Sequence, residues 1–157
     1  MHDGRRLREL IQGFIRGFGL LDQTRTPCGR RMPISTAHAL LELRRHQGYM
    51  QSELAGRLGL TRSGTSRLVA GMERQKLLRR EADRRDRRVY RLHLTAKGKR
   101  LAGENDRKGL AFFNAIARSL SGKERKMLVA SLTALTAVVA RHRSVVGGHA
   151  GAGKGGI

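Results

Sequence analysis

The chain concentrates arginine in one short stretch, between Arg79 and Arg91. Seven arginines and three acidic residues fall there, which leaves a local excess of four positive charges. A guanidinium group offers a rigid fork of N–H donors that matches the oxygens of a phosphate or the major-groove edge of guanine. The segment from Asp83 to Asp86, at the centre, is typical of a turn between two strands. The stretch therefore predicts a hairpin whose arginine-rich tip has nothing to bury.

Two short helices are predicted directly before this hairpin. In the first, Leu54, Ala55 and Leu58 recur at helical spacing. Ser52 is placed to cap its start, and Gly59 supplies the permissive backbone that ends it.

The second helix begins after Thr61, whose side chain can cap it. Four of its residues fall on one face, namely Thr65, Leu68, Val69 and Met72, so small polar residues and arginine fall on the other. Such a face can enter a groove about 12 Å wide and hydrogen-bond to base edges and phosphates. The candidate DNA-binding residues of this helix are Thr61, Arg62, Ser63, Thr65, Ser66 and Arg67. The alternative is an ordinary solvated helix face, but the hairpin that follows favours a DNA-binding winged helix-turn-helix.

The hairpin and its flanks carry a motif. The letters D-R-R-D-R-R stand at residues 83–88, and L-T-A-K-G stands at residues 94–98 after an alternating strand. This arrangement resembles the wing of the MarR family of bacterial transcription regulators, and the resemblance extends more loosely over residues 5–145. It implies a homodimer on a pseudo-palindromic DNA operator, usually a repressor that a small-molecule ligand or oxidation releases. The chain departs from the family pattern at Gly64 and Gly71, which lie inside the second helix.

The predicted fold class is mainly α with a small β-hairpin wing, an α+β winged helix-turn-helix with N- and C-terminal dimerisation helices. Residues 1–48 are assigned to a dimerisation helix and a supporting helix, and residues 49–95 to the DNA-binding region. Residues 96–146 are assigned to C-terminal dimerisation helices, and residues 147–157 to a glycine-rich disordered tail.

Apolar spacing places the remaining helices. An amphipathic helix is predicted over residues 5–24, and a supporting helix from a Ser35 cap to about His46. Thr95 is placed to cap a long helix that ends near Leu120. Ser121 and Glu124 then have the spacing of a capping box.

The resemblance and the helix geometry together suggest a role for each candidate residue. Ser63, Ser66 and Arg67 are expected to read the major groove, while Ser52, Thr61 and Arg62 contact phosphates. The wing candidates for the flanking minor groove are Arg84, Arg85, Arg87 and Arg88. Asp86 is expected to shape the wing by pairing with a neighbouring arginine.

Composition narrows the function further. The 157 residues carry a net charge of +21, which predicts strong, salt-dependent attraction to polyanions. Only 4% are aromatic, which argues against the stacking platforms of single-strand binders.

No phosphate loop, nucleophile–base pair or metal-ligand spacing is evident, so we expect neither an enzyme nor a cofactor or metal site. The sequence shows no signal peptide or membrane span, and a cytoplasmic protein is expected. The alternative function is a nucleoid-type or RNA-binding basic protein without sequence preference.

Two features are candidates for regulation. A ligand pocket is expected between the dimerisation helices and the two DNA-binding regions of the dimer. Its candidate lining residues are Phe14, Phe18, His38, Leu41 and Phe113. The alternative is that these side chains belong to the hydrophobic core. Cys28 lies among arginines that favour the reactive thiolate, which makes it a candidate redox sensor. The alternative for Cys28 is a small loop residue without a redox role.

Overall fold

The computed structural model describes residues 3–147, and the tail predicted beyond Gly147 lies outside them. The chain divides into two compact units, residues 1–112 and residues 113–157, and the boundary falls within one long helix. The first unit holds helices α1 (Asp3–Gly17), α2 (Ile34–Arg45), α3 (Gln51–Leu58) and α4 (Arg62–Arg74), and strands β1 (Tyr49–Met50), β2 (Leu78–Ala82) and β3 (Tyr90–Leu94). Helix α5 (Ala96–Arg118) follows β3 and crosses the boundary, and α6 (Gly122–Gly147) lies in the second unit. The predicted class, mainly helical with a small β wing, is confirmed.

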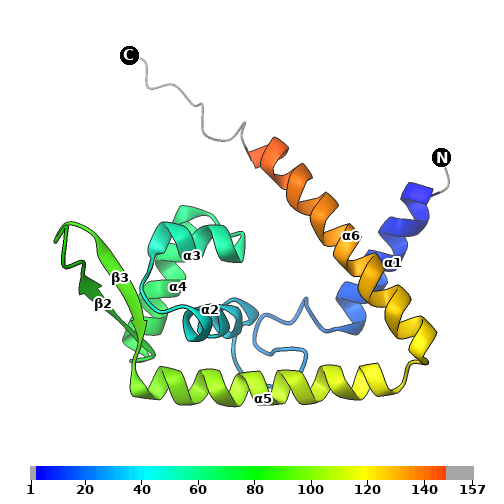
Figure 1. Ribbon diagram of the computed structural model, residues 1–157, viewed down its shortest axis with the longest axis horizontal. Helices are drawn as coiled ribbons and strands as arrows, with labels where there is room; N and C mark the ends of the chain where they lie inside the picture. The colour runs from blue at the N-terminus through cyan, green and yellow to red at the C-terminus, as the bar shows by residue number, and fades with distance from the viewer. Residues whose placement is uncertain (1–2, 148–157) are drawn as a thin grey trace. The chain divides into compact units, whose positions relative to one another are not determined.

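The strands form one antiparallel sheet in the order β1-β3-β2. Leu78 pairs with Leu94 and Ala82 with Tyr90, so β2 and β3 make the predicted hairpin. It extends away from α3 and α4 in Figure 1. Strand β1, which the sequence analysis missed, pairs Met50 with Arg91. The sheet therefore ties the start of α3 to the hairpin.

The core of the first unit lies between α2, α3, α4 and the base of the sheet. Its fully buried side chains come from all of these elements: Leu40, Leu43, Leu54, Val69, Met72, Leu77, Leu92 and Leu94. The helical residues among them recur at spacings of three or four, as a single buried stripe requires. In β2 only Leu78 is buried. The outer part of the hairpin therefore gains almost nothing from the hydrophobic core.

Three helix starts match the sequence prediction. The backbone N–H of Gly64 donates to Thr61 Oγ1 at 3.1 Å, and that of Gly98 donates to Thr95 Oγ1 at 3.1 Å. Ser121 and Glu124 form the predicted capping box, with N–H to side-chain oxygen distances of 2.8 and 3.3 Å.

Two predicted caps are wrong. Helix α2 begins at Ile34 after Pro33, with no side-chain cap, so Ser35 lies inside its first turn. Helix α3 begins at Gln51, and the Met50 N–H donates to the carboxylate of Glu53 at 2.6 Å. Ser52 therefore lies inside α3 rather than capping it.

The helix predicted over residues 5–24 is also too long. Helix α1 ends at Gly17, and Gly19 has a φ of +65°, which reverses the chain. No residue of α1 is buried in the single chain, and Leu10 and Phe14 are about half exposed, at 54% and 48%. The apolar stripe of α1 thus lacks a cover within the described chain.

The junction between the hairpin and α5 requires glycine at position 98. The Thr95 N–H donates to Leu77 O at 3.0 Å, and the Thr95 hydroxyl donates to Lys76 O at 2.7 Å. This brings the first turn of α5 so close that a Cβ on Gly98 would lie 1.9 Å from Leu77 O. The L-T-A-K-G motif therefore marks a backbone contact that only glycine permits.

Replacing Gly98 by alanine is expected to lower the free energy of unfolding by about 2 kcal/mol or more, because backbone must move to admit the methyl group. Chemical denaturation measures the change. Gly109→Ala in the same helix is the control, since a Cβ there meets nothing within 4 Å. The control should be stabilised by roughly 0.5–1 kcal/mol. Equal effects at both positions would contradict the proposed steric origin.

In the second unit, α6 exposes a run of apolar side chains. Those at least 39% exposed are Met127, Leu128, Val129, Leu132, Val138 and Val139. Within residues 3–147, no helix is both long and apolar enough to cross a membrane.

Candidate nucleic-acid interface

Helix α4 presents a polar face to solvent. Arg62, Ser63, Ser66 and Arg67 are exposed, and Val69 is fully buried on the opposite side. The arrangement matches the predicted division into a buried face and an exposed polar face. A helix with exposed small polar side chains and arginine has the shape and the donors that a major groove accepts.

Thr65 is an exception among the candidates, and its prediction as a DNA-binding residue was wrong. Its side chain is fully buried, and its hydroxyl donates to Thr61 O at 2.9 Å. Position 65 lies four residues before Val69, so both point into the core. Thr65 therefore supports the reading helix from behind.

The starts of α3 and α4 lie beside one another. Gln51, Ser52, Ala55 and Arg62 line a shallow groove of about 380 Å³. Ser52 is exposed there, next to the Arg62 side chain, and the first N–H groups of a helix favour anions. Ser52 thus keeps a position suited to a phosphate although it is not a cap.

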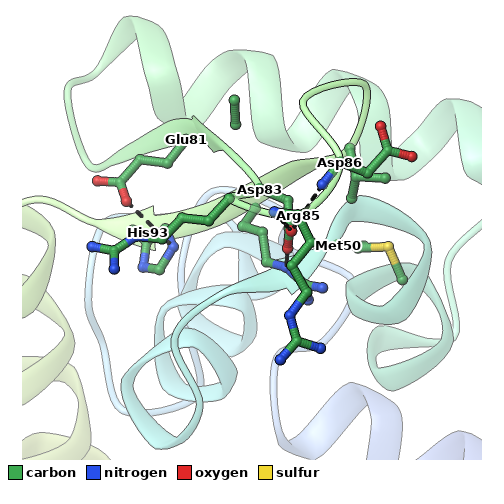
Figure 2. A pocket seen from close by; sticks show the side chains of 10 residues that line it. Met50, Glu81, Asp83, Arg85, Asp86 and His93 are labelled. Carbon is green, nitrogen blue, oxygen red and sulfur yellow. Dashed lines mark hydrogen bonds and ion pairs between the residues drawn. The ribbon is translucent and has the colours of Figure 1, made fainter.

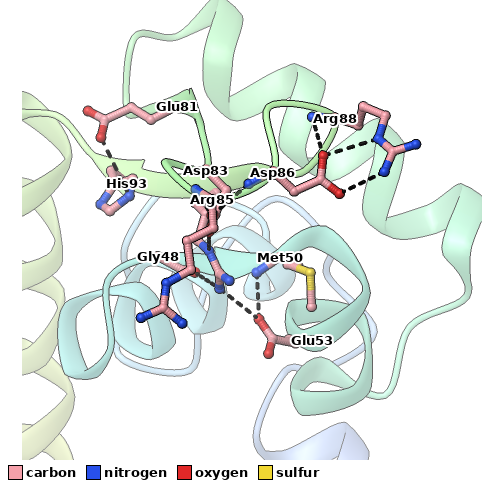
Figure 3. Close-up of polar contacts among 10 residues, drawn as sticks. Gly48, Met50, Glu53, Glu81, Asp83, Arg85, Asp86, Arg88 and His93 are labelled. Atoms are coloured by element: carbon pink, nitrogen blue, oxygen red, sulfur yellow. Dashed lines mark hydrogen bonds and ion pairs between the residues drawn. The ribbon is translucent and has the colours of Figure 1, made fainter.

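The hairpin tip is organised by Asp83. One carboxylate oxygen accepts from the Arg85 N–H at 2.8 Å, and the other accepts from Arg91 Nε at 2.6 Å (Figures 2 and 3). Arg91 lies eight residues away on β3, so this ion pair crosses the hairpin. The hydrogen bond from Arg91, followed by that from the Arg85 N–H, lowers the pKa of Asp83 from 3.8 to about 2. The carboxylate is therefore charged at any physiological pH.

Asp86 pairs with a neighbouring arginine, Arg88. Its carboxylate accepts from Arg88 Nε at 3.1 Å and from the Arg88 N–H at 3.0 Å. The side-chain bond to Arg88 is the main cause that lowers the pKa of Asp86. Arg88 is a predicted DNA contact, and its charge is balanced locally in the free protein.

The arginines of the wing fall into two groups. Four pair with carboxylates: Arg79 with Glu81, Arg80 with Glu73, Arg88 with Asp86 and Arg91 with Asp83. Arg84, Arg85 and Arg87 are exposed, and within the described chain no carboxylate lies within ion-pair distance of their guanidinium groups. These three charges are therefore available to a phosphate backbone.

A groove of about 690 Å³ runs along the wing on the side of Met50. Figure 2 shows acidic and basic side chains along it, including the pair of Glu81 and His93, whose side chains approach to 3.6 Å. The acids in this groove are engaged by arginine or histidine, whereas Arg84 and Arg85, which also line it, have no carboxylate within ion-pair distance in the described chain.

The predicted ligand-pocket residues are not brought together by the first unit. The rings of Phe14 and Phe18 lie 4.2 Å apart between centroids, while His38 is exposed and Leu41 is half-buried on α2. Phe113 belongs to the second unit and is 54% exposed. A shared pocket stays a prediction.

Cys28 is a free, half-buried thiol. Its sulfur lies 3.1 Å from Thr26 Oγ1, in a loop closed by the Arg30 N–H bond to the same hydroxyl. Over residues 3–147, no group of three or more His, Cys, Asp or Glu side chains is arranged to hold a metal ion.

These features define a winged helix-turn-helix module of the DNA-binding class. Helices α3 and α4 carry an exposed polar face, and in the wing that follows, Arg84, Arg85 and Arg87 have no ion-pair partner among the residues that the structure describes. Residues 32–89 match the model of the MarR family. The matched residues run from just before α2 to the end of the wing turn, so the similarity to this family covers α2, α3, α4 and β2. Among curated protein sequences, none matches the chain.

Solved structures show the same fold. The chain is similar to Streptococcus pneumoniae FabT in complex with DNA, with a TM-score of 0.75 and 21% identity, covering 86% of this chain and 96% of that one. It is similar to the DNA complex of Staphylococcus aureus MepR, with a TM-score of 0.66 and 25% identity over 85% of this chain and 96% of that one. The chain is also similar to S. aureus MepR bound to ethidium bromide, with a TM-score of 0.51 and 24% identity. The match covers 87% of this chain and 95% of that one.

The pKa of Asp83 predicts how the wing responds to acid. The folded-state pKa lies below the ordinary value, so the carboxylate contributes stability above about pH 4 and loses it as the pH falls through about 2. We expect Asp83→Asn to lower Tm by a constant amount between about pH 5 and 7, and the gap to wild type to shrink below about pH 4. Thermal unfolding across this pH range measures it.

Asp106→Asn serves as the control, because Asp106 approaches Arg44 only at 3.9 Å on the surface. A gap between wild type and Asp83→Asn that stays constant as the pH falls from about 7 to about 2 would show that folding does not lower the pKa of Asp83.

Proposed function

We propose that this protein is a homodimeric, sequence-specific regulator that binds double-stranded DNA, a repressor released by a small ligand or by oxidation. The observation that carries the proposal is that one module presents two surfaces suited to DNA. The reading face of α4 is followed by a wing whose Arg84, Arg85 and Arg87 have no ion-pair partner in the described chain.

The two surfaces would contact DNA in different ways. Ser63, Ser66 and Arg67 on α4 would read base edges in the major groove, and the wing arginines would enter the flanking minor groove. Ser52, Thr61 and Arg62 would hold phosphates. Arg88 would join the wing contacts only by exchanging Asp86 for a phosphate, so we rank it below Arg85 and Arg87.

Uncovered apolar surface supports the homodimer. Helix α1 exposes Leu7, Leu10 and Phe14, and α6 exposes a second apolar run in the other unit. A row of exposed apolar side chains along a helix often marks a protein interface. Residues 1–48 and 96–146 would supply that interface, and two-fold symmetry would place two reading helices on an inverted repeat.

The proposal includes release from DNA by an effector. The MepR structure with ethidium bromide shows a small aromatic cation bound to a similar fold. Phe14, Phe18, His38, Leu41 and Phe113 remain the candidate pocket, and Cys28 the candidate oxidation site. A cytoplasmic location follows from the proposed role.

Selection from a random duplex DNA library at near-physiological salt tests the proposal. We expect one inverted repeat whose half-sites lie about one helical turn, roughly 34–36 Å, apart. The alternative is a nucleoid-type or RNA-binding basic protein that relies on the +21 net charge. Recovery of no motif, with binding that collapses as salt rises, would favour that alternative.

Two substitutions distinguish a base-specific contact from a contact to the DNA backbone. Arg67→Ala should cost about 1–3 kcal/mol on the selected operator and relax the preference at one base pair. Arg87→Ala should weaken binding to operator and random DNA alike and reduce the salt slope by about one. Fluorescence anisotropy titrations on both duplexes at several salt concentrations measure this. If both variants lost equal affinity on both duplexes, Arg67 would not be a base-reading residue.

A further inference from the structure

Arg91 lies at the meeting point of the wing and the helix-turn-helix. Its Nε donates to Asp83 Oδ2 at 2.6 Å, and its Nη1 donates to Gly48 O at 3.0 Å. The same nitrogen lies 4.0 Å from Glu53 Oε2. One guanidinium group therefore contacts the wing turn, the segment before β1 and the first turn of α3, through Asp83, Gly48 and Glu53, which are labelled in Figure 3.

Each partner of Arg91 is fixed by a further contact. Asp83 accepts from the Arg85 N–H, which holds the turn, and Glu53 accepts from the Met50 N–H, which caps α3. Gly48 has a φ of +86°, so its carbonyl is held in a conformation that favours glycine. A continuous polar chain thus runs from the tip of the wing to the start of the helix-turn-helix.

The outer part of the wing needs such a connection because hydrophobic packing holds only its base. Leu78, Leu92 and Leu94 are buried there, but beyond Leu78 the side chains of β2 are exposed, and an isolated two-stranded hairpin is at best marginally stable in water. Single exposed ion pairs contribute little, but Arg91 and Asp83 are only 38% and 18% exposed and their geometry is fixed by several partners. Arg79, by contrast, pairs with Glu81 two residues away on its own strand and connects no separate elements.

We infer that Arg91 is a positioning residue that sets the wing arginines relative to the reading helix, rather than a DNA contact. The inference rests on the proposed function, because the positioned arginines are those assigned to the minor groove. Without Arg91 the wing would sample several orientations, and Arg87 would lose most of its effect on affinity. A direct DNA contact by Arg91 would instead leave the contribution of Arg87 unchanged.

A double-mutant cycle tests this on the selected operator. Arg87→Ala should weaken binding about tenfold in the wild-type background but less than about twofold in the Arg91→Ala background. Arg79→Ala is the matched control, since it also removes one wing charge, and there the loss on Arg87→Ala should stay about tenfold. An equal loss in the Arg91→Ala and wild-type backgrounds would overturn the inference.

Amide hydrogen exchange on the DNA-free protein gives an independent readout. The N–H of Asp83 donates to Val89 O and the N–H of Val89 donates to Asp86 O, so both amides report closure of the turn. Arg91→Ala should speed their exchange about tenfold or more, and Arg79→Ala should not. Unchanged exchange in Arg91→Ala would contradict a positioning role.

The two experiments distinguish a failure of the proposed DNA-binding role from a failure of the positioning role of Arg91. No effect of Arg87→Ala in the wild-type background would count against the proposed minor-groove grip, while the exchange rates would still decide whether Arg91 holds the wing. Arg91→Lys keeps the charge but lacks the fork that reaches Asp83 and Gly48 O together. It should therefore recover only part of the coupling to Arg87.

Discussion

The wing must hold one orientation without a hydrophobic core of its own. Beyond Leu78 the side chains of β2 are exposed, so the outer hairpin depends on its backbone ladder and on ion pairs across its faces. Arg80 pairs with Glu73 of α4, and Arg91 pairs with Asp83 while contacting Gly48 O. The hairpin is thus braced toward α4 by Arg80 and toward α3 by Arg91, which lies 4.0 Å from Glu53. At its base, the contact of Gly98 with Leu77 O leaves the start of α5 little freedom to shift.

The arginines of the wing have two different roles. An arginine beside a carboxylate holds the wing together, and an arginine without one keeps its charge for a phosphate. Composition cannot separate the two, because pairing depends on which residues face each other across the strands. Arg91 meets Asp83 from eight positions away, and Arg80 meets Glu73 from the preceding helix. The short-range pair of Asp86 and Arg88 was predictable because both lie within one turn.

The same difference in range explains how much of the fold could be predicted. The order of helices, the hairpin and the caps at Thr61, Thr95 and Ser121 follow from local spacing and local hydrogen bonds. Strand β1 has two residues and exists only through pairing with β3, over forty positions later, so no local pattern marks it. The Ser35 and Ser52 caps failed because a serine near a helix start fits several registers equally well. Thr65 was misassigned because its hydroxyl suits DNA and backbone alike, and only burial decides between them.

A high positive charge by itself would give this protein affinity for DNA without preference for a particular DNA sequence. A net charge of +21 attracts any duplex, and each phosphate contact adds affinity without adding preference. Pairing four wing arginines with carboxylates lowers that general attraction where the protein would grip DNA. The remaining arginines gain specificity only if the wing presents them at a fixed distance from the reading face of α4, since register on the groove is a geometric property. A rigid wing with few free charges therefore serves sequence preference better than a flexible wing with many.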